Sequence, residues 1–189
     1  MSRALIVIDV QESFRQRPNW ADVSDPNIAA QVGRLVDASR ANGDKVIWVL
    51  HTEPGSDTVF DPANGHVRLI DGLKPDADEP VLYKTAHNAF TTTNLQQILT
   101  RAGITELVIC GIRTEQCCET TARVGSDLGY QVVFVMDATA TQPIVHPVTG
   151  AVLGVEEIMT RTEFALVGRF ATITTVDEFL TGDAEPALS

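Results

Sequence analysis

The sequence predicts one α/β domain built on a mainly parallel sheet. Short apolar, β-branched runs alternate with segments of helical period along the 189 residues, and the first run is apolar without interruption. An uninterrupted apolar run is typical of a strand buried on both faces. Such alternation favours three layers, with helices on both faces of the sheet. We expect a single domain over residues 1–180 and a frayed tail over 181–189.

The first two strands are predicted at residues 4–8 and 45–50, both rich in Val, Ile and Leu. Between them, apolar residues recur at helical spacing. Asp25 and Pro26 are typical of a helix start, and Gly43 of a helix end. We therefore predict a helix whose first position is Pro26.

Residues 51–80 have no sustained period and contain several Pro and Gly, which predicts a long loop. A short strand follows at 81–84. Leu95 begins a helical apolar stripe that Gly103 ends.

The last part of the chain repeats the strand–helix alternation around a second long loop. We predict strands at 107–110, 131–136 and 172–175, helices at 114–128, at 155–168 and after 175, and a loop at 137–154.

The chain carries 25 acidic and 14 basic residues, a formal net charge of −11. An acidic surface repels phosphate backbones and anionic lipid, so we expect a small-molecule partner, with no nucleic acid and no membrane. The three cysteines Cys110, Cys117 and Cys118 indicate free thiols in a reducing compartment. The run 4–8 is too short for a signal peptide or a membrane span, which favours a cytoplasmic protein.

Several polar residues fall where predicted strands end. Asp9, His51 and Lys84 end or follow the first three strands, and residues 111–118 form the turn after the fourth. Ligands of open α/β sheets bind outside the carboxyl ends of the strands. These positions therefore define a candidate active site.

A thiol near a helix N-terminus and an ammonium group favours the thiolate, which would suit Cys117 beside Lys84. Asp9, next to an apolar strand, is the candidate base that takes its proton. The residues also allow plainer roles: a buried thiol, a carboxylate that caps a turn, and a solvated lysine. Cys110 and Cys118 are predicted to pack in the core.

Three separated sequence motifs resemble those of a known protein family. Residues 5–11 (LIVIDVQ), Tyr83-Lys84 with Ala89-Phe90, and residues 108–123 (VICGIRTEQCCETTAR), together with 135–138, are similar to the isochorismatase-like cysteine hydrolase family, which includes nicotinamidases and N-carbamoylsarcosine amidohydrolases. The resemblance covers about residues 3–175.

The resemblance implies a six-stranded, Rossmann-like parallel sheet and a catalytic triad of Asp9, Lys84 and Cys117. Asp9 would take the thiol proton, and Cys117 would attack a carbonyl to form a thioester that water hydrolyses. It also implies a cis peptide between Ile112 and Arg113, and an oxyanion hole made by the backbone N–H groups of Arg113 and Cys117. The resemblance further implies no cofactor and a homo-oligomer, either a dimer or a tetramer.

Other positions are candidates for contact with the substrate or with a metal. Zinc-dependent members carry Asp-x-His-Pro where this chain has His51-Thr52-Glu53-Pro54, so His51, Glu53 and His66 are an alternative metal site to our expectation of none. The Arg113 side chain could meet an anionic substrate group or pair with Glu115 or Glu119. The predicted pocket residues are Gln11, Phe14, His51 and Phe90.

We therefore expect a cysteine hydrolase that cleaves a small amide, ureido or cyclic-amide substrate. The alternatives are an isochorismatase-type vinyl-ether hydrolase, whose chemistry does not need a thiol, and a catalytically idle binding member of the family.

Overall fold

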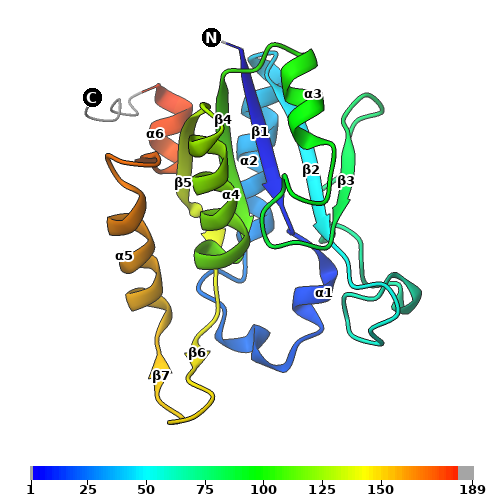
Figure 1. The fold of residues 1–189 in the computed structure, drawn as a ribbon, viewed down its shortest axis with the longest axis vertical. Coiled ribbons are helices and arrows are strands. Elements are labelled where there is room, and N and C mark those ends of the chain that lie inside the picture. Colours follow the sequence, from blue (N-terminus) through cyan, green and yellow to red (C-terminus); the bar gives the residue numbers. More distant parts are fainter. Residues whose placement is uncertain (1, 183–189) are drawn as a thin grey trace.

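The computed structural model describes residues 2–182. Six parallel strands within this range form one sheet in the order β3-β2-β1-β4-β5-β8 (Figure 1). The strands are β1 (Arg3–Ile8), β2 (Lys45–His51), β3 (Val81–Lys84), β4 (Glu106–Ile112), β5 (Gln131–Ala140) and β8 (Thr172–Thr174). The predicted fold class and the six predicted strands are confirmed.

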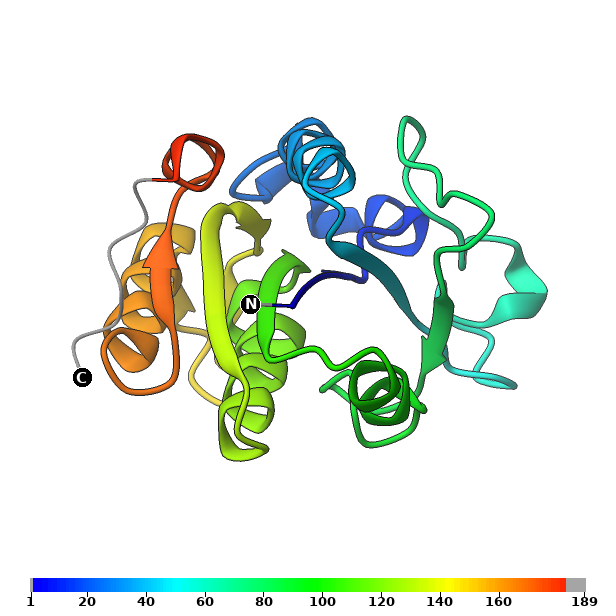
Figure 2. The same ribbon diagram turned by 90° about the horizontal axis from the view of Figure 1, so that it is seen from above.

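Helices cover both faces of the sheet, which confirms the three-layer arrangement. Figure 2 shows helices on both sides of the strands, in two groups. The first group is α2 (Ile28–Ala41) and α6 (Val176–Thr181), and the second is α3 (Leu95–Arg101), α4 (Glu119–Asp127) and α5 (Val155–Leu166). Within the described residues, no helix is both long and apolar enough to cross a membrane.

The central strand β1 contributes to the core on both of its faces. Leu5 and Val7 pack under α2, whereas Ala4, Ile6 and Ile8 pack on the opposite side, and all five are fully buried. Full burial of a large aliphatic side chain contributes roughly 1.5–3 kcal/mol. This two-sided burial explains why the strand is apolar at every position.

Strand β4 approaches β1 closely at Gly111. Its φ is +134°, and a Cβ at this position would lie 1.9 Å from the carbonyl oxygen of Ile8. Only glycine fits there, because any side chain would overlap the backbone of β1. The turn that follows β4 is thereby held against the end of β1.

Two predicted helices differ from the observed ones. Helix α2 begins at Ile28, not Pro26, because the Asp25 carboxylate accepts from the backbone N–H of Asn27 at 2.8 Å and forms a turn before the helix. The residues 114–128, predicted as one helix, form a π-helical turn (Thr114–Cys118) followed by α4. Thr181, the first residue of the predicted frayed tail, is the last residue of α6, and residues 183–189 lie outside the described residues, so the single domain over 1–180 and the frayed tail stay predictions.

The predicted loop at 137–154 also contains regular structure. Strand β5 continues beyond a bulge, so that Thr139 and Ala140 pair with Gly111 and Ile112. The chain then forms an antiparallel hairpin of β6 (Ile144–Val145) and β7 (Val152–Leu153). Pairing with the end of β4 is a long-range interaction that local periodicity does not report.

Residues 12–24, which we call the arch, cross the carboxyl edge of the sheet (Figure 1). The arch contains α1 (Glu12–Arg15) and the 3₁₀ turn Pro18–Asp22. It starts after β1 and ends beyond β5, where Ser24 N–H donates to the Thr141 carbonyl at 2.8 Å and Thr141 N–H donates to Ser24 Oγ at 3.0 Å. Because β4 lies between β1 and β5, the arch passes over the turn that follows β4.

Candidate active site

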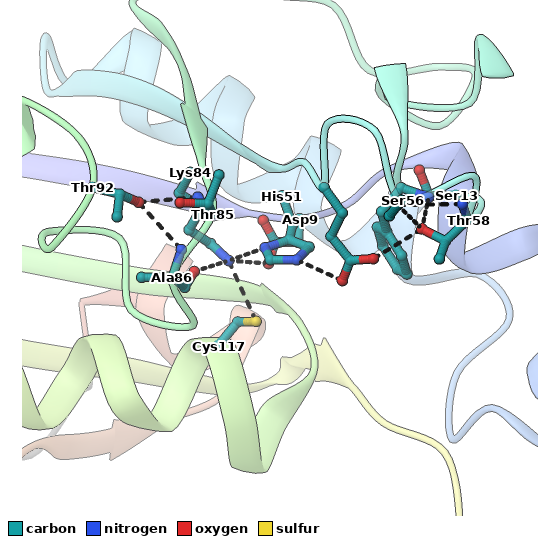
Figure 3. A network of polar contacts seen from close by, with 12 residues as sticks. Asp9, Ser13, His51, Ser56, Thr58, Lys84, Thr85, Ala86, Thr92 and Cys117 are labelled. Atoms are coloured by element: carbon teal, nitrogen blue, oxygen red, sulfur yellow. Dashed lines mark hydrogen bonds and ion pairs between the residues drawn. The ribbon is translucent and has the colours of Figure 1, made fainter. Parts of the chain in front are cut away.

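The carboxyl edge of the sheet brings together side chains from four strand ends. Asp9 follows β1, His51 ends β2, Lys84 ends β3, and Cys117 lies in the π-helical turn after β4. Figure 3 shows Lys84 directed toward Asp9, His51 and Cys117. The three residues of the predicted triad are therefore neighbours in space.

Asp9 and Lys84 form an ion pair that is wholly buried. Oδ2 of Asp9 lies 2.7 Å from Nζ of Lys84, and both side chains have 0% exposure. Burial raises the pKa of Asp9 above its ordinary value, against the opposing charge of Lys84. Burial alone would lower the pKa of Lys84, but the negative charge of Asp9 and the hydrogen bonds to Asp9 and Cys117 raise it. The lysine is therefore a fixed cation.

The remaining contacts of Lys84 position its ammonium group. Nζ donates to the Ala86 carbonyl at 3.1 Å and to Sγ of Cys117 at 3.5 Å, and it lies 3.4 Å from Nδ1 of His51 (Figure 3). An ammonium only donates, so a hydrogen bond at this contact requires His51 to accept through Nδ1 and to carry its proton on Nε2.

The Cys117 thiol is neutral in the unliganded site. Burial raises its pKa to about 12, with a further contribution from the Asp9 carboxylate, whereas Lys84 lowers it. The expectation that a helix N-terminus and Lys84 together yield a lowered pKa is wrong, because loss of solvent outweighs both. A base must remove the thiol proton, and Asp9, with its raised pKa, is suited to that step.

Cys117 differs from the other two cysteines in its surroundings. Its side chain is 6% exposed and contacts an ammonium group, whereas Cys110 and Cys118 are fully buried and burial raises the pKa of each. The Cys117 carbonyl accepts from Thr121 Oγ1 at 2.6 Å, which holds the backbone of the turn. The predicted packing of Cys110 and Cys118 is confirmed.

The peptide between Ile112 and Arg113 is cis, as the resemblance implied. The Arg113 guanidinium pairs with Glu115 at 3.0 Å and donates to the Gln142 carbonyl at 2.9 Å. Of the two predicted partners, Glu115 is therefore the correct one. Glu119 pairs instead with Arg123 at 2.9 Å. The role of the Arg113 and Cys117 backbone N–H groups as donors to an oxyanion stays a prediction.

Two of the predicted pocket residues, Gln11 and Phe90, make contacts within the protein. Gln11 is fully buried, and its amide accepts from His51 N–H at 2.7 Å and donates to the His51 carbonyl at 3.0 Å, so it ties β1 to β2. The Phe90 ring stacks on Tyr130, the residue before β5, with centroids 6.2 Å apart.

An aromatic wall lies beside His51. Phe60 packs edge-on against Phe14 at 5.1 Å and against the ring of His51 at 5.4 Å. Sequence reasoning missed Phe60, although an aromatic residue in a polar loop was a signal for it. Contact of Gln11, Phe14, His51 and Phe90 with a substrate stays a prediction.

The alternative metal site does not form. Glu53 Oε1 lies 3.2 Å from His51 Nε2, but within residues 2–182 no three His, Cys, Asp or Glu side chains are placed to hold a metal ion. The second nitrogen of His51 faces the Lys84 ammonium, and Glu53 also accepts from Thr58 Oγ1 at 2.8 Å. His66 contributes its carbonyl, which accepts from Ser13 of the arch at 2.9 Å.

Known proteins share this fold and much of the sequence. An isochorismatase domain model matches residues 3–176. The chain is 32% identical over 152 residues to nicotinamidase 3 of Arabidopsis thaliana, covering 73% of each chain. It is 29% identical over 173 residues to ureidoacrylate amidohydrolase RutB of Serratia proteamaculans (strain 568), covering 72% of this chain and 68% of that one.

A solved structure extends the match to nearly the whole chain. A cysteine hydrolase from Pseudomonas syringae pv. phaseolicola superposes with a TM-score of 0.83 at 25% identity, covering 97% of this chain and 93% of that one. The domain match spans all six strands of the parallel sheet and every residue of the site described above. The chain belongs to the isochorismatase-like hydrolase family.

Proposed function

We propose that this protein is a cysteine hydrolase that cleaves a small amide, ureido or cyclic-amide substrate through a thioester on Cys117. The observation that carries the proposal is the buried Asp9–Lys84 ion pair with Lys84 Nζ 3.5 Å from the Cys117 sulfur. A buried charge pair next to a thiol is costly to maintain and supplies both a base and a fixed cation for nucleophilic catalysis. The names of the amidohydrolase relatives support the same class of reaction.

The first half of the reaction forms the thioester. Asp9 takes the proton of the Cys117 thiol while sulfur forms a bond to the substrate carbonyl carbon. Lys84 stabilises the negative charge on sulfur. The backbone N–H groups of Arg113 and Cys117 would bind the resulting oxyanion, each donor contributing about 3 kcal/mol in the transition state. Asp9 then gives its proton to the leaving nitrogen as the C–N bond breaks.

The second half returns the enzyme to its starting state. Asp9 takes a proton from water, and the resulting hydroxide attacks the thioester carbonyl. The C–S bond breaks, the acid is released, and the thiolate recovers the proton held by Asp9. Each proton is thus accounted for by one carboxylate, and no cofactor is required in this proposal.

The test is a screen of small amides, ureides and lactams with detection of ammonia or of the free amine. We expect Cys117→Ser to lower turnover by at least a thousandfold on any substrate found. Cys118→Ala is the matched control, since its thiol is fully buried and should leave turnover within a few fold.

Retained turnover in Cys117→Ser would contradict the thioester route. Release of pyruvate from a vinyl ether by the same variant would support the isochorismatase-type alternative. A wild-type protein that binds these compounds but turns over none of them would support an idle binding member of the family.

A further inference from the structure

The side-chain amide of Gln142 is buried without a partner. Gln142 has 0% exposure, and neither its Oε1 nor its Nε2 has a hydrogen-bond partner among the described residues. Nε of Arg113 is likewise buried and unpartnered. Leaving a buried polar group unsatisfied destabilises a protein, so such groups call for an explanation, often a bound ligand or water.

Gln11 shows what a structural glutamine looks like in this protein. It is equally buried, but its Oε1 accepts from His51 N–H at 2.7 Å and its Nε2 donates to the His51 carbonyl at 3.0 Å. The two glutamines therefore differ in partners and not in burial.

Gln142 lies at the same edge of the sheet as Cys117. It follows Thr141, which is bonded to the last residue of the arch, Ser24. The Gln142 carbonyl accepts from Arg113 Nη2 at 2.9 Å. Arg113 precedes the turn that carries Cys117, and its carbonyl accepts from the Cys118 N–H at 3.1 Å. Gln142 is thus bonded to the residue at which the turn of the nucleophile begins.

Gln142 lies next to the end of the arch, because the preceding residue, Thr141, exchanges hydrogen bonds with Ser24. Ala138 and Ala140 belong to the core cluster on the α2 side, which also contains Phe14 of the arch. Thr139 and Thr141 instead bond to the π-helical turn, through Thr114 and Glu115.

The unpartnered atoms comprise one acceptor, Oε1 of Gln142, and two donors, Nε2 of Gln142 and Nε of Arg113. A carboxylate could accept from the two donors, but it has no proton to donate to Oε1 of Gln142. A carboxamide or ureido group presents both an N–H and a C=O in one plane and satisfies both kinds of atom.

We propose that Gln142, with Nε of Arg113, is a specificity-determining subsite that binds a neutral carboxamide or ureido group of the substrate. This inference deepens the proposed function and rests on it for the reacting thiol. Gln142 is separate from Asp9, Lys84 and Cys117, so the subsite can fail while the proposed function stands.

The first test compares the thermal stability of two matched variants without ligand. Gln142→Leu removes an amide that has no partner, so we expect an unchanged or higher Tm. Gln11→Leu breaks bonds to the β2 backbone, so we expect a lower Tm. Equal losses of Tm in both variants would show that Gln142 is structural and would overturn the proposal.

The second test uses the alkylation of Cys117 by two probes. Iodoacetamide and iodoacetonitrile share the iodomethyl group, but only the first carries a carboxamide. We expect Gln142→Leu to slow iodoacetamide by about tenfold, the effect of losing one or two hydrogen bonds, and to leave iodoacetonitrile within twofold.

An equal effect on both probes, or none on either, would overturn the Gln142 subsite while leaving the nucleophile intact. A wild-type Cys117 that reacts with neither probe would contradict the proposed function itself, and the subsite would fall with it. Mass spectrometry of the tryptic peptides identifies which cysteine is modified.

Discussion

At the end of β1, Asp9 holds a carboxylate that water does not reach, next to a lysine that is equally buried. Transfer of either charge from water costs several kcal/mol, and only their mutual attraction offsets this cost. The pair is therefore sensitive to removal of one member, whereas removal of both is tolerated better.

Lys84→Met should accordingly destabilise the protein by about 3–5 kcal/mol, because it leaves the Asp9 carboxylate buried without a cation. Urea unfolding measures the loss. The double variant Asp9→Asn/Lys84→Met serves as the control and should recover a large part of that stability. A Lys84→Met protein as stable as the wild type would show that the pair is not buried in solution.

The pH dependence of Cys117 alkylation should report the ionisation of Asp9. Since burial raises the pKa of Asp9 above 3.8, reactivity should fall as the pH falls through that raised pKa, when the base becomes protonated. Asp9→Asn should abolish this acid limb, leaving a rate that only rises toward the pKa of the thiol. An acid limb that persists in Asp9→Asn would assign it to another group.

The raised pKa of Asp9 also makes the stability of the fold depend on pH. The raised pKa of Asp9 means that the folded state binds its proton more tightly than the unfolded chain does. The contribution of this group is therefore most favourable below the unfolded pKa and is lost as the pH rises through the folded pKa. Lys84 acts in the same direction at high pH, because its own pKa is raised.

Among the elements, the contact between β1 and β4 is the tightest constraint on the site. Gly111→Ala should destabilise the protein by more than about 3 kcal/mol or prevent folding, because its Cβ would lie 1.9 Å from the Ile8 carbonyl oxygen. Gly43→Ala is the matched control: its φ is also positive, at +74°, but nothing lies within 4 Å of the added Cβ.

For Gly43→Ala we expect a loss of about 1–2 kcal/mol, the cost of a left-handed conformation alone. Denaturant unfolding of both variants measures the difference. Similar losses for the two would mean that β1 and β4 can separate without consequence, and would contradict the close approach.

Element prediction succeeded where the signal is local and failed where it is not. The apolar runs located all six strands, but the continuation of β5 to Ala140 depends on pairing with β4, a strand that is distant in sequence. Helix α2 starts at Ile28 and not at Pro26, since the Asp25 carboxylate accepts from the Asn27 N–H in a turn rather than capping the helix. The arch has no periodicity that would have shown it crossing the sheet.

For the whole molecule, the homo-oligomer implied by the resemblance stays a prediction. The hairpin β6–β7 exposes apolar side chains, with Val148 at 87% and Val152 at 63% exposure, and contiguous apolar surface is typical of an interface. Sedimentation equilibrium should therefore give a mass of two or four chains. Val148→Asp should lower that mass if the hairpin is part of the interface, and a wild-type monomer would contradict the prediction.

The sequence by itself determined the α/β class, the positions of the strands and the grouping of Asp9, Lys84 and Cys117. It could do so because apolar periodicity is local and the carboxyl ends of parallel strands meet at one edge. Only the tertiary structure decided the ionisation of Cys117 and the unpartnered state of Gln142. Both depend on burial, which is set by segments far apart in the chain: solvent exclusion raises the thiol pKa, whatever the sequence around it suggests.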